Sequence, residues 1–222
     1  MANRRAVVTG ASSGIGEAAV RALRATGWVV VGVAHLVENG AAVVPGDTVD
    51  VTVDAAYRAA LSAGHTACHL ASLALDAALA DAWRKEAPTD ALGAPAFDAL
   101  AIQESRILAD GSRDVYRIGK SLRRKGFDPD ALADLDALAA RVDAQLADWI
   151  AAGGAVRIER DGDTLADRRT WVCGLPGAEA RIPCGGTHVA SLHELTAATV
   201  AFTSALVEGG LELVMTTTVE RA

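Results

Sequence analysis

The stretch DAAYRAALSAGHTACHLASLALDAALADAWRKE, residues 54–86, decides the fold of this chain. Alanine and leucine dominate it, and both are strong helix formers, so the pattern predicts helical structure from Asp54 onward. We expect a break between two helices at Gly64, because glycine weakens a helix interior. His65 and His69 are four residues apart, so a helix places their imidazoles on one face, about one turn from each other.

A second motif, RIPCGGTHV at residues 181–189, repeats this spacing between Cys184 and His188. Two of the three residues between them are glycines, which let the backbone bend so that the thiolate and the imidazole converge. Three imidazoles and one thiolate suit tetrahedral zinc. Taken singly, each motif is better explained by partly buried helix histidines or an inert core thiol. Taken together, the two motifs predict one metal site.

The segments around these motifs predict a mixture of helix and strand. Residues 128–154 predict an amphipathic helix that Asp128 or Asp130 caps and that a pair of glycines ends. A hairpin is expected around residues 161–163, and the chain finishes on a strand at residues 211–220. Residues 87–115 carry turn signals and a mixed pattern.

The N-terminal part contains a glycine-rich loop, VVTGASSGIGEAA, at residues 7–19. It lies between an apolar run suited to a buried strand and a run of helix formers, and residues 28–33 predict a second buried strand. Glycines at such a turn let the backbone approach a pyrophosphate at the start of a helix. Over about 35 residues the pattern resembles the cofactor loop of the short-chain dehydrogenase/reductase family.

The remaining motifs of that family are missing. No Asn-Asn-Ala-Gly segment follows, and the strand–helix alternation of a doubly wound sheet stops early. Tyr116 and Lys120 have the family's Tyr-x3-Lys spacing but come too early, so we interpret the pair as coincidence. Residues 1–34 are therefore expected to form a partial β-α-β segment of the dinucleotide-binding type, without a working cofactor site.

Composition limits the function classes. The 222 residues carry a net charge of −7, which disfavours an indiscriminate nucleic-acid coat. No apolar stretch reaches the ~20 residues that span a bilayer, and the start lacks a secretory signal, so a cytoplasmic protein is expected. Three widely spaced cysteines argue against a disulfide framework, and we expect Cys68 and Cys173 to be packing residues.

A basic run interrupts the acidic chain between Arg106 and Lys125. Its only acidic residues are Asp110 and Asp114. An ordinary solvated helix face explains such a run as well as phosphate contact does. The residues that we expect to contact RNA, if the second explanation holds, are Arg117, Lys120, Arg123, Arg124 and Lys125.

At the two histidine motifs the sequence resembles the alanyl-tRNA editing proteins, free-standing relatives of the editing domain of alanyl- and threonyl-tRNA synthetases. HTACHL at residues 65–70, CGGTHV at 184–189 and VDAAYR at 53–58 carry the resemblance, which covers roughly residues 35–222. It implies an α+β fold, an antiparallel sheet with helices. The zinc ligands that it implies are His65, His69, Cys184 and His188. The family's Pro-Thr-Gly-Gly-Gly-type N-terminal segment is replaced here by the dehydrogenase-like piece.

The resemblance also implies an activity, the zinc-dependent hydrolysis of Ser- or Gly-tRNA(Ala). Zinc polarises a carbonyl and lowers the pKa of bound water towards ~7, which suits an ester. Four protein ligands fill the coordination sphere of zinc and leave no position for water. Either one of the four ligands therefore binds weakly, or the metal chiefly positions the substrate. Thr187 is the residue that we expect to contact the serine hydroxyl, although a turn cap is an alternative. For His193 and Glu194 we favour surface positions over contact with the ligands.

Two other functions are consistent with the sequence. The glycine-rich loop favours an NAD(P)-dependent oxidoreductase of the short-chain type, although its middle motifs are missing. The histidine and cysteine motifs also allow a non-catalytic, zinc-stabilised RNA-binding module.

Overall fold

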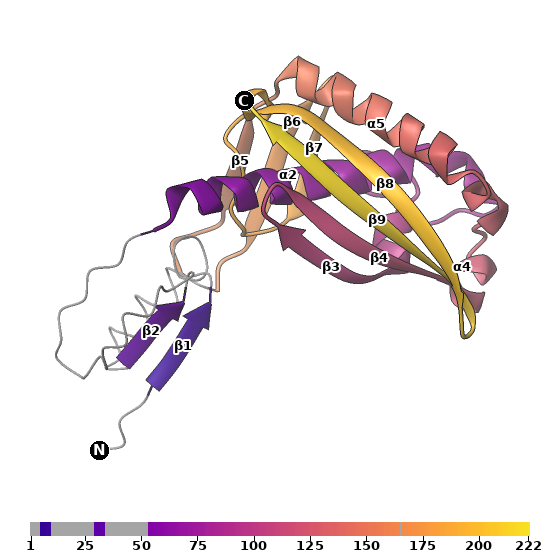
Figure 1. Cartoon of the computed structure of the whole chain (residues 1–222), viewed down its shortest axis with the longest axis horizontal. Coiled ribbons are helices and arrows are strands. Elements are labelled where there is room, and N and C mark those ends of the chain that lie inside the picture. The colour runs from indigo at the N-terminus through magenta and orange to yellow at the C-terminus, as the bar shows by residue number, and fades with distance from the viewer. Residues whose placement is uncertain (1–4, 10–28, 34–52, 165) are drawn as a thin grey trace.

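The computed structural model describes residues 5–9, 29–33, 53–164 and 166–222 (Figure 1). Its elements in chain order are β1 (Arg5–Thr9), β2 (Val29–Val33), α2 (Ala55–Ala78), η1 (Ala80–Ala82), α3 (Phe97–Ala101), β3 (Ile102–Leu108), β4 (Gly111–Gly119), α4 (Lys120–Arg124), η2 (Pro129–Leu132), α5 (Leu135–Ala152), β5 (Val156–Arg160), β6 (Arg169–Leu175), β7 (Ala178–Pro183), η3 (Leu192–Glu194), β8 (Leu195–Val207) and β9 (Gly210–Arg221). The fold is α+β, as predicted. Within the described part of the chain, no helix is long and apolar enough to cross a membrane.

Two antiparallel sheets lie on either side of the long helix α2 (Figure 1). The first has the strand order β3-β4-β9-β8, and α2 packs against β3, β4 and β9. The second has the order β5-β6-β7 and reaches α2 through Trp171 of β6, whose ring centroid lies 5.0 Å from that of His69. Helix α5 packs along β8 and against α2. Helix α2 is therefore the central layer of the molecule.

Helix α2 runs through Gly64 without a break, so the expected division into two helices is wrong. A Cβ atom on Gly64 would lie 2.4 Å from the carbonyl oxygen of Leu108 and 2.5 Å from that of Gly111. Glycine at this position lets the helix touch the backbone of the β3–β4 turn. The tertiary contact outweighs the local cost of glycine in a helix. Asp54 caps the helix, since its carboxylate accepts a hydrogen bond of 2.8 Å from the Tyr57 amide.

The amphipathic helix expected over residues 128–154 is shorter than predicted. Asp128 caps the 3-10 turn η2, and Asp134, not Asp128 or Asp130, caps α5 by accepting a 2.9 Å hydrogen bond from the Ala137 amide. Two short-range caps in succession thus divide the segment into two elements. The C-terminal end agrees with the prediction, because Gly153 takes the left-handed conformation that ends the helix.

The strand predictions hold where the pattern was clear. Strands β5 and β6 form the expected hairpin, and β9 is the expected last strand. Strands β3, β4 and β8 had not been predicted. Strands β1 and β2 confirm the two N-terminal strands, which pair in parallel. The glycine-rich loop and the domain boundary at residue 34 lie outside the described residues.

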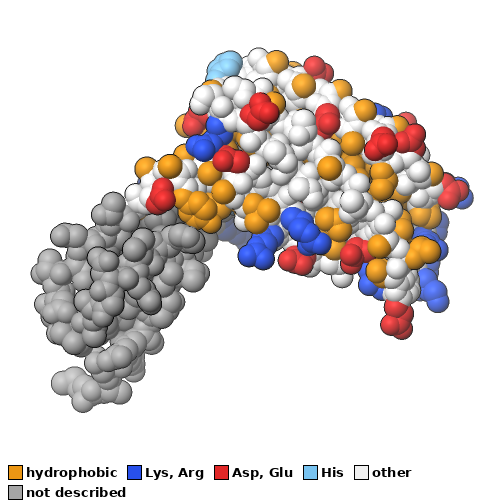
Figure 2. All heavy atoms as spheres, in the orientation of Figure 1, with side chains coloured by type: hydrophobic (Ala, Val, Ile, Leu, Met, Phe, Trp, Pro, Cys, Tyr) orange, Lys and Arg blue, Asp and Glu red, His pale blue; other side chains and the backbone are white. Residues whose placement is uncertain are grey.

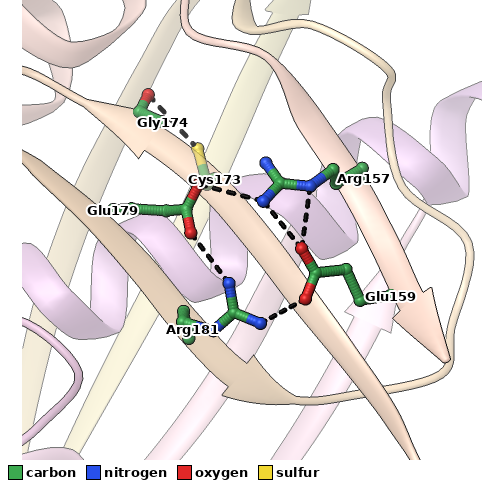
Figure 3. A network of polar contacts seen from close by, with 6 residues as sticks. All are labelled: Arg157, Glu159, Cys173, Gly174, Glu179 and Arg181. Atoms are coloured by element: carbon green, nitrogen blue, oxygen red, sulfur yellow. Dashed lines mark hydrogen bonds and ion pairs between the residues drawn. The ribbon is translucent and has the colours of Figure 1, made fainter. Parts of the chain in front are cut away.

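The outer face of the second sheet carries a closed ring of ion pairs (Figure 3). Arg157 of β5 contacts Glu159 at 2.7 Å and Glu179 of β7 at 3.0 Å, and Arg181 of β7 contacts the same two carboxylates. The guanidinium groups lower the pKa of both glutamates. The ring spans the central strand over Val172, which pairs with both arginines and is fully buried. It ties the two edge strands together across β6.

We predict that Gly64→Ala destabilises the protein although alanine is the better helix former. Propensity alone would raise the free energy of unfolding by about 1 kcal/mol, whereas the clash with two carbonyl oxygens should lower it by about 2 kcal/mol or more. Chemical denaturation measures the sign. The control is Ala144→Gly on the exposed face of α5, which should cost only about 1 kcal/mol. A stabilised Gly64→Ala variant would show that the helix does not touch the turn.

Candidate metal centre

Four side chains from two distant segments converge beside α2. His65 and His69 come from the helix, and Cys184 and His188 from the loop after β7, with one potential ligand atom of each within 4.8 Å of the others. The sulfur of Cys184 lies 3.5 Å from Nε2 of His65 and 3.5 Å from Nε2 of His188. Zinc–sulfur and zinc–nitrogen bonds of ~2.3 and ~2.1 Å at a tetrahedral angle place sulfur and nitrogen about 3.6 Å apart. These two edges therefore have the dimensions of a tetrahedral zinc site.

His69 supplies a second sign that the cluster fits a metal. Its Nε2 atom is buried and has no hydrogen-bond partner among the described residues. A buried polar atom without a partner costs free energy, so such atoms are rare in folded proteins. A metal ion held by the four residues would satisfy it.

The glycines of the loop have a different role from the predicted one. A Cβ atom on Gly186 would lie 2.3 Å from Cε1 of His65, so glycine leaves room for this imidazole under the loop. Gly185 and Gly186 also hydrogen-bond through their backbones with the sulfur of Cys184, which lowers its pKa, although burial raises it more. The pair thus both admits one ligand and supports another.

Thr66 is a residue of the candidate site that sequence reasoning missed. It is fully buried, and its hydroxyl donates to the carbonyl of Ser62 at 2.9 Å and accepts from the amide of Val189 at 3.2 Å. Nδ1 of His188 lies 3.2 Å from the same oxygen. Because the only hydroxyl proton goes to Ser62, Nδ1 carries a proton and donates it to Thr66. Nε2 of His188 is then left as an acceptor that faces Cys184, as a metal ligand requires.

Burial keeps the three imidazoles of the cluster neutral. Burial lowers the pKa of His65, although a hydrogen bond with the backbone of Thr187 acts to raise it. Burial and the charge of His65 together lower the pKa of His69 to about 3. The pKa of His188 falls to about 2 through burial and the two neighbouring histidines. Neutral imidazole is the form that binds metals, so at neutral pH only the Cys184 thiol has to lose a proton.

A cleft of about 780 Å³ opens beside the cluster. Thr187 lies in its wall between Gly186 and His188 and is half-buried. The contact with substrate that the sequence predicts for Thr187 stays a prediction. On another side the cluster is closed by the fully buried ring of Trp171, whose centroid lies 5.8 Å from that of His188. The cluster is therefore reached from the side of the loop rather than from the second sheet.

The predicted RNA-contacting residues lie elsewhere. Arg117 is half-buried near the end of β4, whereas the other four occupy α4 and the residue after it and are exposed. Figure 2 shows Lys and Arg side chains at the end of the molecule where α4 lies. This segment adjoins the chain that follows α2, because the Asp128 amide donates to the carbonyl of Ala82. Helix α2 continues for nine residues, about 14 Å, from His69 to its end at Ala78, and Ala82 lies beyond that end. The structure does not bring the basic residues to the metal cluster.

The other residues singled out from the sequence do not join the cluster. Tyr116 is a buried residue of β4 that donates a 2.9 Å hydrogen bond to Asp98, whereas Lys120 is exposed, so the two do not share a helix face. His193 and Glu194 are exposed, as predicted, and Glu194 caps the η3 turn. Cys68 and Cys173 are buried away from the ligands, as expected of packing residues.

The comparisons with known proteins add no relative: no protein-family model matches the chain, and a search of curated proteins finds no match.

We predict that Thr66→Val weakens zinc binding about 10- to 100-fold, the usual effect of losing the partner that orients a ligand. Valine keeps the shape but leaves Nδ1 of His188 and the Val189 amide without an acceptor. Competition against a chelator measures the affinity. Thr66→Ser keeps the hydroxyl and should bind zinc as the unchanged protein does. Equal affinity in the valine variant would contradict the assigned role.

Proposed function

We propose that the chain is a zinc-dependent deacylase that hydrolyses mischarged aminoacyl-tRNA, namely Ser- or Gly-tRNA(Ala), in the cytoplasm. The observation that carries the proposal is the convergence of His65, His69, Cys184 and His188. His188 brings this cluster to the wall of a cleft that Thr187 also lines. Bound zinc would supply the polarisation of a carbonyl that ester hydrolysis needs. The editing-type motifs in the sequence support this substrate over other esters.

In this proposal Thr187 selects the substrate. It neighbours the ligand His188 in the chain and faces the same cleft. A hydroxyl there would hydrogen-bond the serine side chain, and it would lose that partner when the ester carries alanine. A binding site built around such a hydrogen bond can reject the analogue that lacks it.

The basic residues of α4 support a macromolecular substrate. They adjoin the chain beyond the C-terminal end of α2, and this end lies about 14 Å from His69 along the helix, farther than an amino-acid ester extends. A tRNA reaches both places, with its backbone at α4 and its 3′ end in the cleft. Phosphate contacts of this kind position a nucleic acid and provide affinity that falls as salt rises.

A second function has its own support. Four protein ligands fill a tetrahedral zinc site, as in sites whose role is structural. A zinc-stabilised RNA-binding module without catalysis would use the same cluster and the same basic residues. Hydrolysis of the ester distinguishes the two functions.

We predict that the purified protein carries about one zinc ion per chain and hydrolyses Ser-tRNA(Ala). His65→Ala or Cys184→Ala should lose most of the zinc and reduce hydrolysis at least 100-fold, since each removes a ligand. Metal analysis and a deacylation assay give both results. Cys173→Ala removes a buried cysteine outside the cluster and is the matched control. Zinc without hydrolysis would favour the binding module, and full zinc in both ligand variants would rule out the site.

We predict that Thr187→Val narrows the preference for Ser-tRNA(Ala) over Ala-tRNA(Ala) about tenfold while zinc content stays unchanged. The variant loses the hydrogen bond to the serine hydroxyl, whose loss in a buried site has about this effect. The rates on the two esters measure the preference. Thr199→Val, at an exposed position of β8, is the control. An unchanged preference would place the selection at another residue of the cleft.

A further inference from the structure

Two arginines line the cleft beside the metal cluster, although the chain as a whole is acidic. The whole chain has 28 acidic and 21 basic residues. Among the residues that line the cleft, Arg58 and Arg221 carry a positive charge and only Glu194 has an acidic side chain. An arginine in such a cleft that has no acidic partner favours an anionic ligand.

Of these three residues, Arg58 is left to meet a ligand. Arg221 is held by Asp110, with Nε 2.6 Å from Oδ1. Glu194 accepts hydrogen bonds from the amides of Ala190 and Ser191 at 2.7 and 3.1 Å. The guanidinium of Arg58 is exposed and has no hydrogen-bond or ion-pair partner among the residues that the structure describes. It therefore provides five donors that a planar or tetrahedral anion can use.

Arg58 lies on the same side of α2 as the first metal ligand. Seven residues separate it from His65, which is two helical turns, or about 10 Å along the axis. Helical hydrogen bonding connects the intervening residues, since Ser62 donates to the carbonyl of Arg58 and Thr66 to that of Ser62. A ligand that reaches both ends is longer than an amino acid and compatible with one nucleotide.

Apolar side chains complete the wall between the two ends. Val53, Ala59, Ile158 and Val189 line the cleft together with the polar residues. Small-molecule sites commonly combine such an apolar surface with a few placed polar groups. A nucleoside offers the matching features, a flat apolar base face and a ribose that carries groups at both ends.

We propose that the cleft binds a 5′-phosphorylated nucleoside end, with the phosphate on Arg58 and the esterified 3′ side at the metal cluster. The inference rests on the proposed function and adds a second point of recognition to it. Arg58 is a substrate-binding residue in this arrangement. The phosphate that it binds is the one that links the terminal nucleotide to the rest of the RNA strand.

The test compares two non-hydrolysable ligands, 3′-deoxy-3′-(L-seryl)amino-adenosine with and without a 5′-phosphate. Their affinities for the zinc-loaded protein are measured by calorimetric titration. The phosphate should increase affinity about tenfold or more, the value of a charge-assisted hydrogen bond, and Arg58→Gln should remove the gain while leaving the affinity for the unphosphorylated ligand unchanged. Arg141→Gln, on the exposed face of α5, should keep the full gain.

Several outcomes overturn the inference. One such outcome is that the 5′-phosphate increases the affinity for the unchanged protein less than twofold. Another is that the Arg58→Gln variant keeps the full gain in affinity. Binding of free L-serine that depends on Arg58 would assign the residue to a carboxylate instead. If neither ligand binds, the cleft is not a nucleotide site, and hydrolysis of Ser-tRNA(Ala) by the same preparation shows whether the deacylase function fails with it.

Discussion

The close contact between α2 and the β3–β4 turn determines how the layers of this protein fit together. Gly64 lets the helix reach the backbone of Gly111, and Gly111 in turn lies against β9, since a Cβ atom on it would be 2.3 Å from the carbonyl oxygen of Thr217. The amide of Asp110 also donates a 3.0 Å hydrogen bond to the carbonyl of Ala60. The backbones of α2, the β3–β4 turn and β9 are thus in direct contact with one another. These contacts oppose sliding of α2 along the sheet.

A buried polar cluster prevents α2 from rotating as well. On the side of the first sheet, Asp114 accepts hydrogen bonds from Ser105 at 2.5 Å and Ser112 at 2.7 Å, and the Cys68 thiol lies 3.6 Å from it. Burial and the charge of Asp114 raise the pKa of Cys68 to about 12, so this thiol stays protonated and can donate. Cys68 precedes His69 in the chain, so the contact that holds one face of the helix also helps to set the direction of the His69 side chain on another face. The first sheet thereby contributes to the position of the cluster.

The sequence predicted which four side chains converge, because the spacing within each pair has a physical basis that does not depend on the fold. His65 and His69 follow the period of a helix, and Cys184 and His188 flank a glycine turn. Gly64 was misjudged because a local propensity cannot reveal that another backbone passes at this point. Thr66 was missed for a similar reason, since its partners on Val189 and His188 are more than 120 residues away. Strand β8 is rich in alanine and threonine and lacks a clear alternation, so only its pairing with β9 makes it a strand.

The cluster is closed on the side of the second sheet and open on the side of the loop. This difference bears on whether a metal held by four protein side chains could take part in catalysis. Trp171 closes the cluster toward the second sheet, and Thr66 holds His188 from behind. The open side is the loop from Gly186 to His188, which forms part of the wall of the cleft. His65 and His69 lie on a helix that is anchored to the first sheet. Cys184 directly follows β7, and its amide donates to the carbonyl of Arg169 at the start of β6, whereas His188 lies farther along the loop. His188 is the member of the cluster that lines the cleft, with its Nδ1 atom beside Thr66. A substrate would therefore approach a metal held by the four residues from the side of His188, where a loop rather than a helix or strand carries the side chain.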